Sequence, residues 1–364
     1  MPKAFQHVVL ALSATLLFLA LLLPVAVATA TAASDPDSIN IPTKALRSHR
    51  CIHDELQQSV LDAAAARHPA LQEGTQGDTF KQCTVTRTLA RSGLPFVSSA
   101  ALARTTAAAA NTITWGRLRI LVSTLDLYDN SVYCTPNKTY TSNKQGGYVA
   151  CTFTDVLTDE KRETLTQYLL PQALRMHTER LRVQQVQGTW KVTDLHGVCA
   201  NFQVPIEHTT VGVRDVDFIV YVASVPAQRD VVAWATTCQV HLDNRPAVGV
   251  INIPAANLLS HYDHYMIHTV AHEVAHALGF SGRFFSSTGI SSTVTGIRGK
   301  TAAVPVVNST TVVAKAREHF GCPTAAYMEL EDAGGDGTMG SHWKIRNAAD
   351  ELMAPVSGAG YYTA

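Results

Sequence analysis

The sequence lacks net charge, internal repeats and closely spaced cysteine pairs. Its 29 lysines and arginines equal its 29 aspartates and glutamates, and charged residues make up only 16% of the 364 residues. Proteins that bind nucleic acids carry a basic face, so this composition indicates no nucleic-acid partner. The absence of any Cys-x-x-Cys pair also excludes a thiolate zinc finger of ordinary spacing.

Long apolar runs are confined to the N-terminus. Residues Val8 to Leu23 are almost wholly apolar, follow Lys3 and precede Ala-x-Ala patterns at 28–32. This pattern predicts a secretory signal peptide over residues 1–33. An uncleaved membrane anchor is the alternative, but the apolar run is short for a membrane span.

Secretion predicts that most of the seven cysteines are paired, and the odd number leaves at least one thiol free or its partner missing. The sequons that begin at Asn137 and Asn308 are candidate glycosylation sites and fit the same compartment. The cysteines are Cys51, Cys83, Cys134, Cys151, Cys199, Cys238 and Cys322.

Residues 34–110 show little helical periodicity. Ala-rich tracts at 63–66 and 107–110 alternate with Ser, Thr and other polar residues, and turn signals are frequent. We interpret this region as a pro-segment. An N-terminal domain that is never removed is the alternative.

From Trp115 onward the pattern is sharper and predicts an α+β fold, a sheet backed by helices. Period-2 alternation and apolar runs predict strands, and apolar stripes predict helices. The strands are expected at 118–122, 190–194, 218–223 and 248–253, and the helices from about 158, at 265–279 and at 312–319.

Two histidines four residues apart form the clearest chemical motif, His272-Glu273-Val274-Ala275-His276. At this spacing on a helix both imidazoles lie on one face, about 6 Å apart, and can reach one zinc ion. Glu273 lies about 100° round the helix and flanks the ion without binding it, which is the position of a general base. A helix that merely exposes two histidines is the alternative.

His264 and His268 continue the four-residue spacing, but only His272 is followed by a glutamate. His268 and His276 would be about 12 Å apart along the helix axis, so one ion cannot bind both. We therefore expect His264 and His268 to lie outside the metal site.

The helix is expected to end at Gly279, because glycine permits a left-handed turn. Such a turn can bring a later residue back as the third protein ligand that a catalytic zinc requires. The motif, this glycine and a later methionine resemble the metzincin signature. In most metzincins the third histidine follows three residues after the glycine, but Gly282 occupies that position here.

This departure resembles leishmanolysin, the family of surface metalloproteases of trypanosomatid parasites, in which a long insertion precedes the third histidine. Segments 340–347 and 350–355 resemble the distal motif of that family. The resemblance implies His342 as the third zinc ligand and Met353 as the methionine beneath the metal. Other segments that resemble the family are 115–120, 184–188, 233–238 and 249–254.

The resemblance implies a metzincin-type fold, a twisted mixed sheet packed on helices, with one Zn²⁺ per chain. The expected divisions are a signal peptide (1–33), a pro-segment (34–110), an N-terminal catalytic subdomain (111–279) and a region with the insertion, third ligand and methionine turn (280–364). Disulfides Cys134–Cys151 and Cys199–Cys238 are also implied.

The family continues into a cysteine-rich C-terminal part that this sequence does not include, so the chain is expected to be a truncated copy. The partner of Cys322 would lie there, and membrane association would come only from a lipid anchor at its end. The implied location is secreted or at the cell surface, with host-surface proteins among the partners and a role in cell adhesion.

Cys51 lies in segment 48–54, which resembles the pro-region motif of the family. A thiolate on zinc would fill the open coordination position, exclude water and keep the enzyme latent. The basic, histidine-rich flank is expected to favour the thiolate. A Cys51–Cys83 disulfide is the alternative, because secretion favours pairing.

These features predict a zinc endopeptidase that hydrolyses peptide bonds of extracellular proteins. Val248 to Pro254 is expected to form the sheet edge that aligns an extended peptide, and Pro355 and Val356 are expected to line the pocket on the leaving side. Two alternatives stay open. One is an inactive surface adhesin, and the other is a different zincin whose third ligand is Glu329 or Glu331.

Overall fold

The computed structural model describes residues 50–67, 115–228, 230–333, 338–349 and 351–355. All of these residues belong to one unit of the chain, Leu46–Ala364. The predicted signal peptide, most of the predicted pro-segment, Cys83 and Val356 lie outside the described residues.

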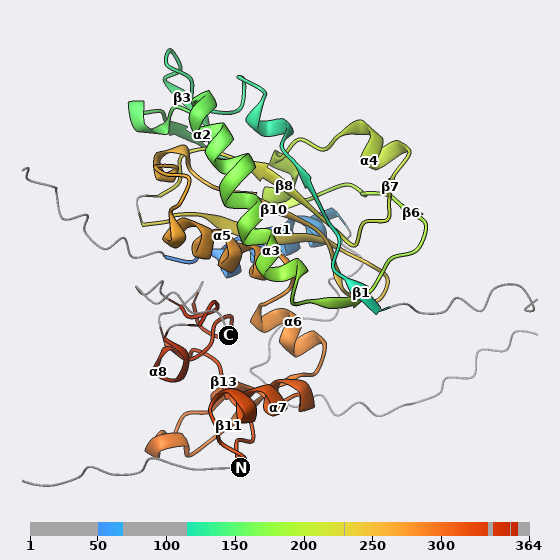
Figure 1. The fold of residues 1–364 in the computed structure, drawn as a ribbon, viewed down its shortest axis with the longest axis vertical. Helices are drawn as coiled ribbons and strands as arrows, with labels where there is room; N and C mark the ends of the chain where they lie inside the picture. The colour runs from blue at the N-terminus through green and yellow to red at the C-terminus, as the bar shows by residue number, and fades with distance from the viewer. Residues whose placement is uncertain (1–49, 68–114, 229, 334–337, 350, 356–364) are drawn as a thin grey trace, which may run out of the picture. The chain divides into compact units, whose positions relative to one another are not determined.

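A four-stranded mixed sheet lies at the centre of the first part of this unit (Figure 1). Three strands run parallel, and the fourth runs antiparallel to its neighbour. The predicted α+β class is confirmed, and strands lie within about two residues of three of the four expected positions. The order across the sheet is β2 (Ile120–Ser123), β8 (Phe218–Ala223), β10 (Pro246–Asn252) and β9 (Trp234–Val240).

The prediction that Val248 to Pro254 forms a sheet edge is wrong. β10 pairs with β8 on one side and with β9 on the other, so its main-chain groups are used on both sides. Residues 247–252 are all buried, as expected for a strand that is covered on both faces. The edge strand next to β10 is β9.

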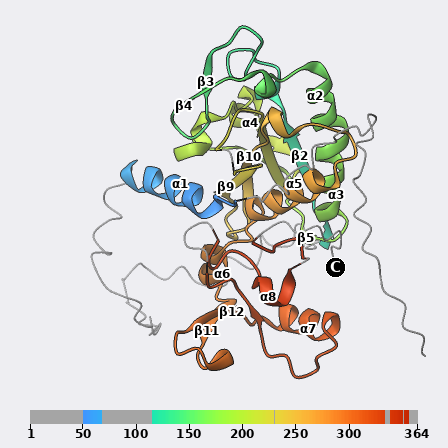
Figure 2. The same cartoon turned by 90° about the vertical axis from the view of Figure 1, so that its left-hand side faces the viewer.

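Helices cover both faces of this sheet. Alternate residues of β8 point to opposite faces: Val220 packs in the cluster that contains Val270 and Val274 of α5 (His264–Ala277), whereas Tyr221 packs with Leu56 of α1 (His53–Arg67). Figure 2 shows α1 on one side of the sheet and α3 and α5 on the other. The metal-motif helix therefore lies against the sheet, as expected.

α1 is not among the helices that the sequence predicted. Its inner face repeats every four residues through Ile52, Leu56 and Val60, which are all buried. In the alanine run that follows, both faces of the helix are equally apolar. The apolar periodicity is therefore visible over only two turns.

The helix expected from about residue 158 is present and begins after Thr158, whose side chain accepts a hydrogen bond from Lys161 N–H. It consists of α2 (Asp159–Glu163), a π-helical turn η5 (Thr164–Leu169) and α3 (Leu170–Thr178). Pro171 explains the wide turn, because its ring would clash with the carbonyl four residues earlier in a regular helix.

The strand expected at 190–194 is mostly wrong. Only Thr189–Trp190 (β6) is extended, and it pairs with β7 (Val213–Arg214). Two further antiparallel pairs are β1 (Trp115–Arg117) with β5 (Arg182–Gln184), and β3 (Tyr140–Ser142) with β4 (Tyr148–Ala150). Short helices fill the connections: η3 (Leu125–Leu127), η4 (Phe153–Asp155), η6 (Gly197–Asn201), α4 (Ile206–Thr210) and η7 (Ala255–Asn257).

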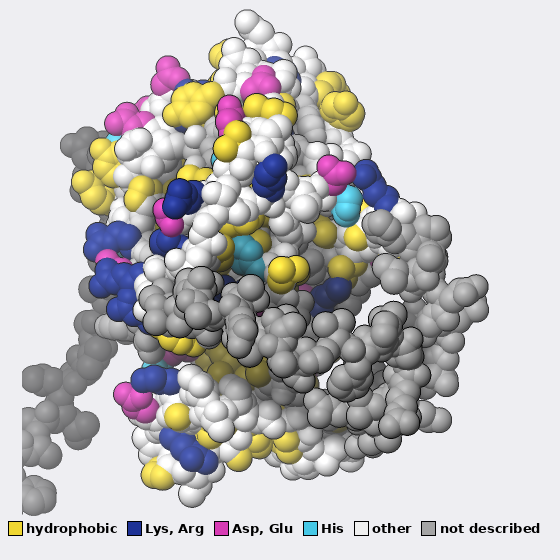
Figure 3. Space-filling model, turned by 90° about the vertical axis from the view of Figure 1, so that its right-hand side faces the viewer, with side chains coloured by type: hydrophobic (Ala, Val, Ile, Leu, Met, Phe, Trp, Pro, Cys, Tyr) yellow, Lys and Arg dark blue, Asp and Glu magenta, His cyan; other side chains and the backbone are white. Residues whose placement is uncertain are grey.

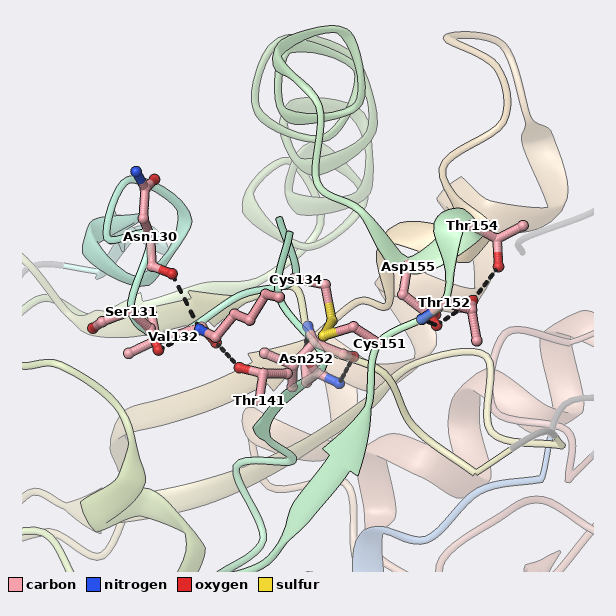
Figure 4. Close-up of a disulfide and its surroundings, with 12 residues drawn as sticks. Asn130, Ser131, Val132, Cys134, Thr141, Cys151, Thr152, Thr154, Asp155 and Asn252 are labelled. Carbon is pink, nitrogen blue, oxygen red and sulfur yellow. Dashed lines mark hydrogen bonds between the residues drawn. A yellow bond between two sulfur atoms is a disulfide. The ribbon is translucent and has the colours of Figure 1, made fainter. Parts of the chain in front are cut away.

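The two disulfides implied by the family resemblance are present, Cys134–Cys151 and Cys199–Cys238. Figure 4 shows the first, which joins the segment after η3 to the end of β4; nearby, Thr141 Oγ1 donates to the Val132 carbonyl. The second joins η6 to the edge strand β9.

The insertion after the metal-motif helix is more regular than the sequence suggested. The helix expected at 312–319 is α7 (Thr310–His319), and a three-stranded sheet of β11 (Ser291–Val294), β12 (Val304–Val307) and β13 (Met328–Glu329) accompanies it. Further short helices are α6 (Gly282–Ser287), η8 (Ile297–Gly299) and α8 (Ile345–Ala348).

On the face drawn in Figure 3, basic and acidic side chains are interspersed and form no single basic patch. No helix of the described residues is long and apolar enough to cross a membrane.

Candidate metal centre

Helix α5 carries the first two histidines of the motif. Asp263 caps it by accepting a hydrogen bond from Met266 N–H, and the helix ends before Gly279, whose φ of +97° is left-handed. A side chain at Gly279 would be strained at this φ and would lie only 3.0 Å from Pro246 Cγ. The turn sets Phe280 so that its carbonyl accepts from Nδ1 of His276 at 2.7 Å.

Three imidazoles converge from distant parts of the chain. Nε2 of His276 lies 3.1 Å from Nε2 of His272 and 3.2 Å from Nε2 of His342, and the last two atoms are 3.2 Å apart. All three side chains are buried. The structure therefore brings together the two motif histidines and the distal histidine that the family resemblance implied.

The opposite nitrogen of each ring meets a main-chain carbonyl. Nδ1 of His272 lies 2.7 Å from the Leu352 carbonyl, and Nδ1 of His342 lies 2.9 Å from the Thr338 carbonyl. A carbonyl only accepts, so each Nδ1 carries the proton and each Nε2 presents its lone pair to the centre. Burial, with His53, His272 and His342 close by, lowers the pKa of His276 well below its usual value, so its ring is neutral.

This set of donors fits zinc. Three imidazole Nε2 atoms that converge on one place form a site for a cation, and four-coordinate zinc with bonds of about 2.0–2.1 Å separates its nitrogen ligands by about 3.3 Å. The observed separations of 3.1–3.2 Å are close to that value.

Cys51, in the part of the chain predicted as a pro-segment, supplies a fourth donor atom. Its Sγ lies 3.3 Å from Nε2 of His276, and the four donor atoms all lie within 4.8 Å of one another. The thiol is buried and free of any disulfide. The expectation that the flank favours the thiolate is wrong, because burial and the Glu273 carboxylate raise the pKa of Cys51 well above its usual value. A cation bound among the imidazoles would favour the thiolate.

Glu273 lies on α5 beside the ligands but outside their group of donor atoms. Its side chain is fully buried, and Oε2 accepts a hydrogen bond from Ala235 N–H of β9 at 2.9 Å. Helix geometry turns this carboxylate about 100° away from the His272 direction. The arrangement holds an acidic group between the metal helix and the edge strand.

Met353 lies in a turn behind the histidines. The preceding residue, Leu352, accepts from His272, and the carbonyl of Met353 accepts from Trp343 N–H at 2.9 Å. The methionine is buried. This turn therefore connects the first histidine of the motif to the residue that follows His342.

The structure does not bring the other candidates to this centre. His264 is exposed and His268 is half-buried. Glu329 forms a bidentate pair with Arg298 at 2.6 Å, and Glu331 accepts from Lys344, so each rival glutamate has another partner. Both candidate glycosylation residues, Asn137 and Asn308, are exposed.

Comparison with known proteins now decides the family. A family model described as leishmanolysin matches residues 49–364. The chain belongs to the leishmanolysin family.

Among curated relatives, the chain is 52% identical over 327 residues to a leishmanolysin homolog of Crithidia fasciculata, with 86% of this chain and 48% of the relative covered. It is 50% identical over 327 residues to leishmanolysin of Leishmania major (87% and 52% covered) and 50% identical over 317 residues to that of Leishmania donovani (87% and 50%). The chain thus spans about half the length of these relatives. The family resemblance read from the motifs is confirmed.

Two contacts of this leishmanolysin-family chain were missed at the level of sequence. The ring of His53 stacks on that of His276, with centroids 4.5 Å apart, and its Nδ1 lies 3.0 Å from the Ala235 carbonyl. Asp54 Oδ1 accepts from Ser341 Oγ at 2.7 Å, next to His342. His53 and Asp54 come two and three residues after Cys51, within segment 48–54 that resembles the pro-region motif of the family, and this resemblance was the signal that could have pointed to them.

Proposed function

We propose that this chain is a zinc-dependent endopeptidase that its own pro-segment holds latent. The observation that carries the proposal is the convergence of three buried Nε2 atoms on one point, with the Cys51 thiol beside them. In this proposal His272, His276 and His342 hold one Zn²⁺, and Met353 lies in the supporting turn. A bound zinc ion would polarise the scissile carbonyl and lower the pKa of a water molecule at its open position.

Glu273 is proposed as the general base. Its carboxylate takes the proton of the attacking water and passes it to the leaving amine, a role that contributes about 10²–10⁴-fold to the rate. Its bond from Ala235 N–H fixes one oxygen and holds the carboxylate toward the edge strand. Its burial excludes competing solvent.

β9 is proposed to align the substrate. The N–H of Ala235 donates to Glu273, and its carbonyl lies 3.0 Å from Nδ1 of His53. The proposed pro-segment also reaches Thr236 of this strand through Gln57, and Arg50 N–H donates to the carbonyl of Asp230, which precedes β9. A protein or peptide substrate in extended form could use the same edge through main-chain hydrogen bonds.

Secretion or cell-surface location, glycosylation and a role in adhesion to host-surface proteins are proposed on the family resemblance. The predicted signal peptide and the exposure of both sequon asparagines support the secretory route.

Substitution of Glu273 by alanine tests the proposal. The variant should retain one zinc per chain by metal analysis and lose at least about 10²-fold in cleavage of a peptide substrate by the processed protein, because it removes a base and no ligand. Loss of the metal with a retained fold would place Glu273 among the ligands instead. Zinc bound by the wild type without turnover would favour the alternative of an inactive adhesin.

A further inference from the structure

Glu331, at the end of the insertion, makes main-chain hydrogen bonds to the segment that carries His342. Glu331 N–H donates to the His342 carbonyl at 2.8 Å, and the Glu331 carbonyl accepts from Gly340 N–H at 2.8 Å. Thr338, two residues before Gly340, orients the His342 ring through its carbonyl. The main chain of Glu331 therefore pairs with His342 itself and with Gly340, two residues before it.

The carboxylate of Glu331 reaches past His342 to the residues that follow it. Oε1 accepts from Lys344 Nζ at 2.5 Å and from Asp332 N–H at 3.0 Å, and Oε2 accepts from Ile345 N–H at 3.1 Å. Burial alone would raise the pKa of Glu331, but the hydrogen bonds from Lys344 and Ile345 outweigh it and lower the pKa, so the group is a carboxylate at neutral pH.

We propose that Glu331 is a positioning residue for the third metal ligand, holding His342 so that its Nε2 meets those of His272 and His276. The proposal rests on the metal site proposed above. Glu331, which the sequence suggested as an alternative third ligand, is thus proposed to support His342, the residue that lies at the metal centre.

The position of His342 needs such support. It lies 66 residues after His276, so the chain between them fixes no geometry by itself. His342 lies outside the helices, so hydrogen bonds from other segments hold it. Those of Glu331 act on His342 itself, and Trp343 N–H adds a bond to the Met353 carbonyl. Groups behind metal ligands typically contribute 10–100-fold to metal affinity.

Glu329 offers a matched control two residues earlier. It is a buried carboxylate in an ion pair, as Glu331 is, but its side chain binds Arg298 of the insertion and Asn347 of α8 rather than Lys344 and Ile345. Glu329→Gln should therefore lose a similar ion pair while the carboxylate contacts of Glu331 to Lys344 and Ile345 stay in place.

The experiment compares Co²⁺ binding by the full chain in wild type, Glu331→Gln and Glu329→Gln. Co²⁺ replaces zinc and reports its ligand geometry through d–d absorption. We expect Glu331→Gln to bind Co²⁺ about 10-fold or more weakly in chelator competition and to show a weaker, shifted d–d band. Glu329→Gln should keep the wild-type affinity and spectrum, although thermal unfolding in EDTA should show that both variants are destabilised.

Equal affinity and spectrum in the two variants would overturn the proposal, because Glu331 would then contribute only to stability. Should Glu331→Gln not fold, Lys344→Met provides the same comparison, since it removes the ammonium that holds the carboxylate. A wild-type spectrum in Lys344→Met would also overturn the proposal. A wild-type chain that binds no Co²⁺ would contradict the metal site itself, an outcome distinct from unchanged binding in the variants.

Discussion

Each imidazole of the candidate metal centre is held from behind by a main-chain carbonyl. The carbonyls of Leu352, Phe280 and Thr338 lie 2.7–2.9 Å from the Nδ1 atoms. A carbonyl neither titrates in the working pH range nor turns independently of the chain, so it keeps Nδ1 protonated and Nε2 available. The orientation of the three rings is thus a property of the folded main chain.

His342→Ala should remove the third ligand. Since even supporting groups contribute up to about 100-fold to metal affinity, loss of a direct ligand should weaken zinc binding by more than that. Competition with a chromophoric chelator would measure it. His264→Ala, a substitution at an exposed position of the same helix α5, should leave the affinity unchanged. A zinc affinity within a few-fold of wild type in His342→Ala would contradict the assignment.

The site residues differ in how far the sequence could predict them. The four-residue spacing of His272 and His276 places both rings on one helix face, so local periodicity was sufficient. No local pattern connects His342 to them, and only the family resemblance pointed to it. The carbonyl of Thr338 had no signal, because any residue offers the same main-chain group.

Among the elements, α1 contacts the rest of the described chain at several places besides the thiol of Cys51, which precedes it. It packs so closely on η6 that a Cβ on Gly197 would lie 2.7 Å from the Ser59 carbonyl oxygen. Gln57 accepts a buried hydrogen bond from Thr236 Oγ1 of β9. Leu56, on the inner face of α1, packs in the apolar cluster that contains Tyr221 of the sheet. These contacts hold α1 on the sheet in addition to any bond between Cys51 and a metal.

Cys51→Ala in the uncut chain should raise peptide cleavage, but to less than the level of a chain cut between α1 and β1. Adding Leu56→Asp should raise it about 10-fold or more further, since an unpaired carboxylate in this apolar contact destabilises docking by a few kcal/mol. As the control, Glu55→Gln, at an exposed position of the same helix, is combined with Cys51→Ala instead of Leu56→Asp and should add little activity. If Cys51→Ala alone were as active as the cut chain, the thiol would account for all of the inhibition, and the prediction would be wrong.

Asp332 connects the insertion to the distal motif through Lys300 and Lys344. Hydrogen bonds from these two lysines lower the pKa of Asp332 from 3.8 to about 2. The folded pKa is below the unfolded one, so the stabilisation is fully present above about pH 4 and is lost as the pH falls through about 2.

Asp332→Asn should therefore reduce the free energy of unfolding by about 2 kcal/mol at pH 7. Urea unfolding of the wild type and the variant should give a constant difference between pH 5 and 7, and the difference should shrink below about pH 4. A difference that is independent of pH down to 3 would show that the effect comes from packing and not from charge.

The element predictions failed where the deciding contact was distant. An apolar run such as Val248 to Ile253 predicts a buried strand, but its order in the sheet depends on which strands pair with it, and β9 covers the side expected to be open. The strands of the insertion are short and rich in Ser, Thr and Val, so they become strands only by pairing with one another. The π turn before Pro171 was also not predicted, because the apolar stripe of that helix does not reveal it.

At the scale of the whole molecule, the candidate metal centre joins segments that are far apart in the chain. Its donors come from the segment before α1 (Cys51), from α5 (His272 and His276) and from the segment between β13 and α8 (His342). A metal ion bound there would act as a cross-link that exists only in the folded chain, so it stabilises folding in proportion to RT ln(1 + [M]/Kd).

Removal of zinc should therefore lower the Tm of the uncut chain and loosen α1. At a free zinc concentration 100 times Kd the stabilisation is about 2.7 kcal/mol, which corresponds to a Tm shift of roughly 5 °C or more. Differential scanning calorimetry with and without EDTA would measure the shift, and hydrogen exchange should show reduced protection of α1 amides in EDTA. The variant His342→Ala is the control, because its weak site should make the EDTA shift small. An equal shift in wild type and His342→Ala would mean that the chelator acts at another place in the chain.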